Sequence, residues 1–103
     1  MITVIVQFKL PAAVTTDQAK KIFSGTASKY REVNGLIRKY YLLSEDCGTA
    51  GGVYLWKSRE DADRLYTDEW KTFVRQRYNA EPVVTYFSSP VVVDNLSGQI
   101  VKE

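Results

Sequence analysis

Arg38 is the charged side chain of this sequence that is best placed to do chemistry. It lies in an apolar run, with Leu36, Tyr40 and Leu42 expected on the same face of a strand. A guanidinium among apolar neighbours needs an anion, because an unpaired buried charge is strongly unfavourable. Arg38 could therefore stabilise an anion that develops on a substrate, while the hydroxyl of Tyr54 or Tyr40 relays a proton.

Further candidates would bind a substrate, and Tyr40, the alternative proton relay, is also one of these. Aromatic rings stack on planar ligands, and we expect this role for four side chains: Tyr40, Trp56, Trp70 and Tyr86. Gly52 joins them because alternation places it on the same strand face as Tyr54. A glycine inside a strand indicates that something approaches the backbone closely there.

Each candidate also has a structural interpretation. Strand tyrosines commonly belong to a core or a dimer interface. Trp56 and Trp70 would then fill the space between sheet and helix, and Arg38 would pair with an acidic residue such as Glu45 or Asp46. A pocket beside Tyr54 would favour chemistry, whereas a pocket filled by the two tryptophans would favour a structural role.

The sequence contains no histidine and one cysteine, Cys47. This excludes Ser-His and Cys-His nucleophile pairs and the usual zinc, non-haem iron and haem ligands. Acid–base chemistry would have to use Tyr, Asp, Glu, Lys or water. Because a nucleotide-binding fingerprint is also absent, we expect a protein without metal, haem or flavin.

The net charge of +2, from 14 basic and 12 acidic residues, is too balanced to indicate binding to nucleic acid or to a membrane surface. No apolar run approaches the roughly 20 residues of a membrane span, and the N-terminus does not resemble a signal peptide. A single cysteine cannot form an internal disulfide. These features predict a cytoplasmic protein.

The elements that must position the candidates follow from periodicity and capping signals. Alternating apolar residues predict four strands, at 2–9, 36–43, 50–57 and 83–93, the last with a break at Pro90. Residues 44–49 form a polar turn between the second and the third strand. Helical spacing predicts a helix over 16–33, started by a capping box at Thr15 and Gln18. It also predicts two short helices, or one kinked helix, from Ser58 to about Asn79, and Asp68 could cap the second segment.

This order of elements is the βαββαβ pattern of a ferredoxin-like α+β domain with an antiparallel sheet. We expect a single domain over residues 1–95 and a polar C-terminal tail over 96–103. Helices can cover only one face of such a sheet. The other face would carry apolar residues, with Ile5, Tyr40, Tyr54 and Trp56 as candidates, and this predicts a partner.

Three stretches resemble one protein family: Asn34–Lys39, Ala50–Trp56 and the helix from Ser58. The chain is similar to the antibiotic-biosynthesis-monooxygenase-like dimeric α+β barrels, and within them to the YdhR-like group of proposed monooxygenases. The resemblance implies a homodimer and, for enzymatic members, oxygenation without metal or flavin. It supplies no catalytic set, and the haem-degrading branch relies on a histidine that this chain lacks.

Two functions therefore stay open. The first is a cofactor-independent monooxygenase acting on a small electron-rich aromatic or enolic substrate, with Arg38 and Tyr54 as catalytic residues. The second is a non-catalytic homodimer that binds a small aromatic or apolar ligand. An isomerase or lyase on the same barrel is a third, weaker option.

Overall fold

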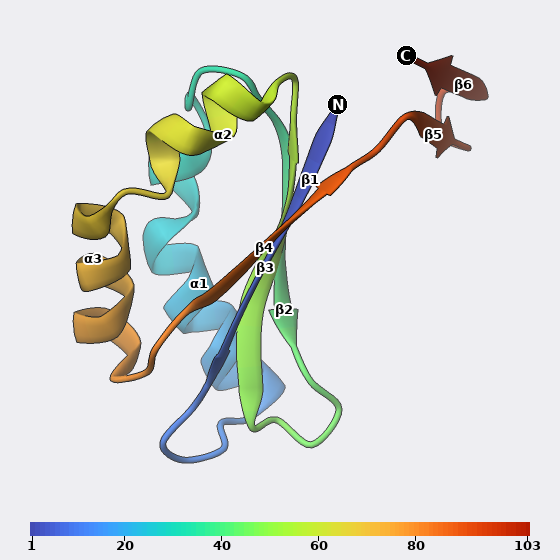
Figure 1. Ribbon diagram of the computed structural model, residues 1–103. Helices are drawn as coiled ribbons and strands as arrows, with labels where there is room; N and C mark the ends of the chain where they lie inside the picture. Colours follow the sequence, from blue (N-terminus) through green and yellow to red (C-terminus); the bar gives the residue numbers. More distant parts are fainter.

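Four antiparallel strands form the main sheet in the computed structural model, which describes all 103 residues. They are β1 (Ile2–Lys9), β2 (Leu36–Leu43), β3 (Thr49–Trp56) and β4 (Val83–Ser88), and their spatial order is β2-β3-β1-β4. Each neighbouring pair is antiparallel. The ferredoxin-like α+β fold expected from the sequence is confirmed, with β1 and β3 in the centre (Figure 1).

Three helices cover one face of this sheet: α1 (Thr16–Tyr30), α2 (Arg59–Leu65) and α3 (Asp68–Tyr78) (Figure 1). The capping box expected at the start of α1 is present. The Thr15 hydroxyl accepts from the Gln18 amide at 3.1 Å, and the Gln18 side-chain oxygen accepts from the Thr15 amide at 2.8 Å. The helix ends at Tyr30, three residues earlier than expected.

The second helical region is divided into two helices, as the interrupted periodicity predicted. The residue that caps α3 is Thr67, whose hydroxyl accepts from the Trp70 amide at 3.2 Å. Asp68, the expected cap, is the first residue of the helix. Asn79 ends α3 in the left-handed conformation, with φ of 50°.

A bulge in β2 changes which side chains share a face. Leu36 pairs with Trp56, but the preceding residue of β3, Leu55, pairs with Arg38, so Ile37 is an extra residue. As a result, Leu36 lies on the helix-covered face, and the expectation that it shares a face with Arg38 was wrong.

The core lies between the sheet and the helices. Strand residues at alternating positions point into it, and they are fully or nearly fully buried: Val4, Val6 and Phe8 from β1, and Ala50, Tyr54 and Trp56 from β3. The expected placement of Tyr54 and Trp56 on the uncovered face was therefore wrong, because the register Val4↔Tyr54 and Ile2↔Trp56 sets these residues on the core side. Ile5 and Tyr40 do lie on the uncovered face.

The end of the chain forms a separate hairpin that projects from the main sheet on the side away from the helices (Figure 1). It consists of β5 (Val91–Asp94) and β6 (Gln99–Lys102). Residues 91–93 were expected to resume the preceding strand, and 96–103 to form a polar tail. The chain instead leaves the sheet at Ser89 and Pro90, and both segments pair with each other.

None of the helices combines the length and the apolar character needed to cross a membrane.

Candidate functional site

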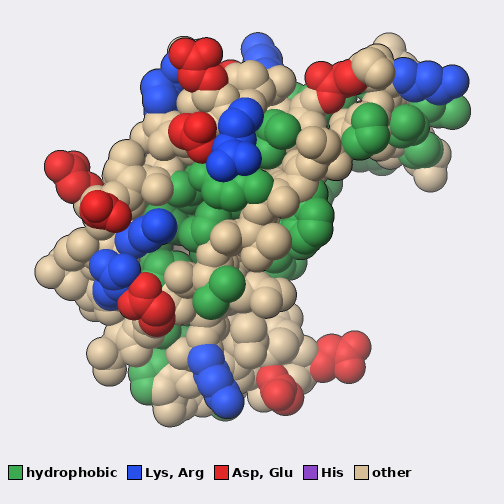
Figure 2. Space-filling model, viewed as in Figure 1, with side chains coloured by type: hydrophobic (Ala, Val, Ile, Leu, Met, Phe, Trp, Pro, Cys, Tyr) green, Lys and Arg blue, Asp and Glu red, His purple; other side chains and the backbone are tan.

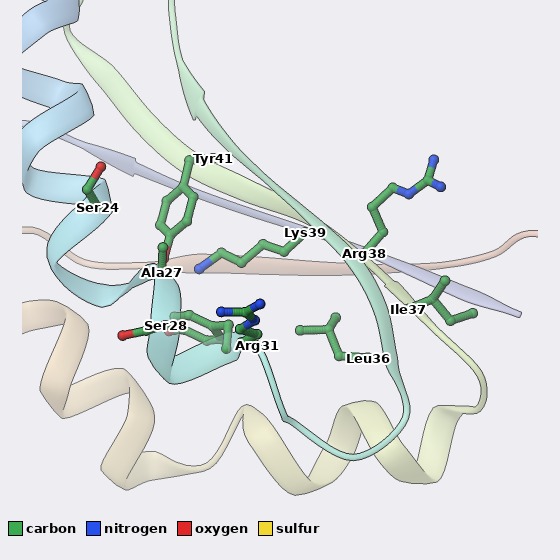
Figure 3. A pocket seen from close by; sticks show the side chains of 10 residues that line it. Ser24, Ala27, Ser28, Arg31, Leu36, Ile37, Arg38, Lys39 and Tyr41 are labelled. Atoms are coloured by element: carbon green, nitrogen blue, oxygen red, sulfur yellow. The ribbon is translucent and has the colours of Figure 1, made fainter. Parts of the chain in front are cut away.

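A pocket of about 510 Å³ lies between α1 and the edge strand β2. Ten residues from both elements line it, and Figure 3 labels all of them except Tyr30: Ser24, Ala27, Ser28, Tyr30, Arg31, Leu36, Ile37, Arg38, Lys39 and Tyr41. No carboxylate lines this pocket, whereas the side chains of Lys39 and Arg31 both reach into it (Figure 3). Its charge character is therefore cationic.

Lys39 is the central side chain of this site. Its Nζ atom lies 3.4 Å from the ring centroid of Tyr30, 3.8 Å from that of Tyr41 and 4.7 Å from that of Tyr54. The amine is thus surrounded by three aromatic rings from α1, β2 and β3. These rings attract the protonated form through cation–π interactions.

The protonation of Lys39 is shifted towards the neutral amine. Burial, with a smaller contribution from the positive charge of Lys29, lowers the pKa of Lys39 to about 7. An amine with this pKa can accept a proton and return it near neutral pH, which is the requirement for a general acid–base group.

The three rings around the Lys39 amine form a cage, and hydrogen bonds hold two of them in place. The Trp70 indole donates to the Tyr30 hydroxyl at 3.1 Å, and the hydroxyls of Tyr41 and Thr26 lie 2.8 Å apart. The first contact joins α3 to α1 and the second joins α1 to β2. The cage geometry therefore depends on the docking of both helices.

Gly52 provides the space that the Lys39 side chain and the Tyr54 ring occupy. A Cβ atom at Gly52 would lie 3.0 Å from Cε1 of Tyr54 and 3.3 Å from Cε of Lys39. Gly51 is more tightly restricted, because a Cβ atom there would lie 1.8 Å from the carbonyl oxygen of Val6. The close approach expected at Gly52 is confirmed, and it involves a ring and a lysine side chain, while at Gly51 the backbone of β1 approaches.

The aromatic candidates divide into a buried group and a peripheral one. Trp56 donates to the Tyr66 hydroxyl at 3.0 Å and stacks on Tyr54 with ring centroids 6.3 Å apart, so Trp56 belongs to the core. Trp70 is also buried, and it orients Tyr30. Tyr86 lies on β4, at the opposite edge of the sheet from β2, beneath the guanidinium of Arg59.

Tyr54 contacts the site from the core of the protein. It is 3% exposed and is not one of the residues lining the pocket. Burial, together with the neighbouring Tyr30 and Tyr66 hydroxyls, raises the pKa of Tyr54. Its phenol therefore stays protonated, and its contribution to this site is the ring that packs against Lys39.

Arg38 and Tyr40 lie on the uncovered face of the sheet. The Arg38 guanidinium is exposed and donates to the Tyr40 hydroxyl at 3.3 Å. Figure 3 shows its side chain pointing to the side of β2 opposite that of Lys39. The expectation that Arg38 and Tyr54 share one pocket was wrong, because the sheet separates their side chains within the chain.

Sequence reasoning missed Lys39 as a functional residue. The signal was present, because Lys39 alternates with Tyr41 and Leu43 in β2 and so occupies an otherwise apolar face. What the sequence does not contain is the register that places Lys39 opposite Tyr54 of β3.

Comparison with known proteins assigns the chain to a family. Residues 4–88 match the family described as "putative mono-oxygenase ydhR". This match spans most of the 103 residues, and the protein belongs to that family. The resemblance inferred from the sequence is confirmed.

Solved structures with this fold include several antibiotic biosynthesis monooxygenases. The monooxygenase ActVA-Orf6 of Streptomyces coelicolor, solved in complex with nanaomycin D, is 17% identical, with a TM-score of 0.65 over 85% of this chain and 86% of its own. SnoaB of Streptomyces nogalater, a cofactor-independent oxygenase, is 15% identical, with a TM-score of 0.63 over 85% and 91%. At these identities the similarity shows the fold alone. No curated protein sequence matches the chain significantly.

Proposed function

We propose that this member of the YdhR family is a cofactor-independent monooxygenase that acts on a small electron-rich phenol or enol bound between α1 and β2. The observation that carries the proposal is the Lys39 amine, which lies among three tyrosine rings at the wall of a pocket of about 510 Å³. A pocket of this size holds a small aromatic ligand. Lys39 takes the place in this proposal that the sequence had suggested for Arg38 and Tyr54.

The first step is removal of a proton from the substrate. The neutral Lys39 amine accepts the hydroxyl proton of the phenol or enol, which leaves a substrate anion beside an ammonium group. The ammonium stabilises that anion electrostatically. The pKa of Lys39, at about 7, allows the residue to act in both forms near neutral pH.

The substrate then supplies the electrons for oxygen. Its carbanionic carbon bonds to O₂, and the resulting peroxide takes the proton back from Lys39 to give a hydroperoxide. Lys39 next removes the remaining hydrogen from that carbon as a proton while the O–O bond breaks. One oxygen atom becomes a carbonyl and the other leaves as hydroxide, which Lys39 protonates to water. The sum is CH₂ + O₂ → C=O + H₂O, with the carbon oxidised and oxygen reduced.

The proposal is tested by oxygen consumption with phenols and enols, together with incorporation of one ¹⁸O atom from ¹⁸O₂ into the product. Lys39→Met keeps the length of the side chain and removes the base, so turnover should fall at least a hundredfold while the fold is retained. Lys57→Met, at an exposed loop position, is the matched control. Full activity in Lys39→Met would reject Lys39 as the base. Ligand binding without oxygen uptake would favour the alternative, a non-catalytic ligand-binding protein.

The pH dependence provides a second, independent test. Activity should rise with pH as Lys39 loses its proton around pH 7. Lys29→Gln removes the nearby positive charge that helps to lower the pKa of Lys39, so the midpoint of the profile should move to higher pH. An unmoved midpoint in Lys29→Gln would mean that another group titrates.

We also propose that the protein is a homodimer that joins two uncovered sheet faces. Exposed apolar side chains support this proposal, among them Tyr40 at 54% and Phe87 at 49% exposure. The α1–β2 pocket lies on the other side of the sheet, so dimerisation leaves it open to small ligands.

A further inference from the structure

The pocket beside Lys39 continues along α1 into a second, mostly apolar one, whose lining also includes Lys20. This second pocket, of about 380 Å³, shares Ser24, Ala27 and Tyr41 with the first. The two therefore form one groove along the α1–β2 edge, which we call the edge groove. At its far end lie Phe23 and Leu43.

The two ends of the edge groove differ in chemistry. At the apolar end, Phe23 stacks on Tyr41 with ring centroids 4.9 Å apart and an interplanar angle of 20°. At the other end Arg31, the residue that follows α1, reaches the space beside Lys39 (Figure 3). No acidic residue lines either part of the groove.

Arg31 has no ionic partner within the chain. The arginines that are neutralised pair with carboxylates elsewhere, as Arg59 does with Asp63 at 2.9 Å and Arg75 with Glu81 at 2.6 Å. Arg31 makes no such bridge, and its side chain is exposed to solvent. A guanidinium keeps its charge at any physiological pH and binds carboxylates through two parallel hydrogen bonds.

We infer that the edge groove selects aromatic carboxylic acids, with Arg31 binding the carboxylate, Lys39 facing the ring hydroxyl and the aromatic body lying towards Phe23 and Tyr41. The inference rests on the proposed function for the role of Lys39, but the recognition by Arg31 concerns binding alone. Arg31 is thus a specificity-determining residue. A neutral phenol of the same ring would fit the groove and lack the second anchor.

The test compares two probes that differ only in the carboxylate: 1-hydroxy-2-naphthoate and 1-naphthol. Titration calorimetry with the full chain at pH 7.5 should show the acid binding at least tenfold more tightly. Arg31→Gln should reduce the affinity for the acid to about that for 1-naphthol and leave 1-naphthol unchanged. Arg31→Lys should recover part of the loss, because the charge remains and the planar fork is absent.

The control is Lys57→Gln, which removes a positive charge from an exposed loop outside the groove. It should leave both affinities unchanged, and added salt should weaken only the binding of the acid. Equal affinities of the wild type for the two probes, or an equal loss of both in Arg31→Gln, would overturn the inference. If the acid binds through Arg31 but no oxygen is consumed, the proposed oxygenase fails while the recognition stands. If 1-naphthol is oxidised and the acid binds no more tightly than 1-naphthol, the recognition by Arg31 fails while the proposed oxygenase stands.

Discussion

Burying the Lys39 ammonium costs electrostatic free energy on folding. A role of the amine at the site would explain why a lysine lies there. In the unfolded chain the ammonium is hydrated, whereas in the folded protein it lies among aromatic rings with Lys29 nearby. Its pKa is lowered from 10.5 to about 7. A residue that only filled this space could be apolar, so a lysine here indicates that the amine itself is used.

This cost predicts a pH-dependent stability. Below pH 7 Lys39 is protonated in both the folded and the unfolded chain, so folding must desolvate its charge. Between about pH 7 and 10.5 the unfolded chain binds a proton that the folded chain does not, so stability rises with pH until the cost disappears. Lys39→Met should therefore be more stable than the wild type at pH 6, by on the order of 5 kcal/mol, and the difference should shrink towards pH 10. Urea unfolding at several pH values measures it, with Lys57→Met as the control. A difference independent of pH would show that Lys39 is not desolvated.

Gly52 predicts a packing effect at the same cage. A side chain at position 52 would meet Tyr54 and Lys39, and it would also lie 3.2 Å from the Tyr40 carbonyl oxygen. Gly52→Val should lower the free energy of unfolding by about 1–3 kcal/mol and weaken ligand binding. Gly48→Ala is the matched control, because the added Cβ would only touch an Asp46 oxygen at 3.4 Å. Unchanged stability and binding in Gly52→Val would mean that the glycine is incidental.

At the scale of elements, α1 forms one wall of the edge groove, so its N-terminal cap should matter for stability. Thr15→Ala removes the hydroxyl that accepts from the Gln18 amide, and it should cost about 1 kcal/mol. Thr16→Ala, one residue later and without such a bond, should cost less. Thermal or urea unfolding compares the two. Equal effects would mean that the capping box adds nothing to the stability of α1.

The elements and their ferredoxin-like arrangement were largely predictable, whereas the register between strands and the face that the helices cover were not. The Thr15 capping box, the break between α2 and α3 and the alternation in β1 are local signals, and each predicted an element that the structure contains. The Ile37 bulge and the pairing Lys39↔Tyr54 are relations between strands. Alternation within one strand fixes which residues share a face, but it does not say which face the helices cover. For this reason Tyr54 was assigned to the uncovered face, and Lys39 was not recognised as part of a site.

At the scale of the whole molecule, the sheet has one covered and one uncovered face. The uncovered face carries Ile5, Tyr40, Val53, Leu55 and Phe87, several of them partly exposed. Figure 2 shows further hydrophobic side chains on the projecting hairpin and on the surface beside it. The hairpin carries Val91, Val93 and Ile100, all more than half exposed. An apolar surface that spans a sheet and a projecting hairpin is typical of an interface between subunits.

We therefore expect a dimer with a buried area on the order of 2,000 Å². Sedimentation at micromolar concentration should give twice the chain mass. Phe87→Glu places a charge on the uncovered face, in the edge strand β4, and desolvating that charge should shift the protein to monomer. Thr72→Glu adds the same charge at an exposed position of α3, on the side covered by helices, and should leave the dimer intact. A wild type that sediments only as a monomer would contradict the prediction. Dissociation in both variants would point to net charge as the cause, and dissociation in Phe87→Glu alone assigns the interface to the sheet.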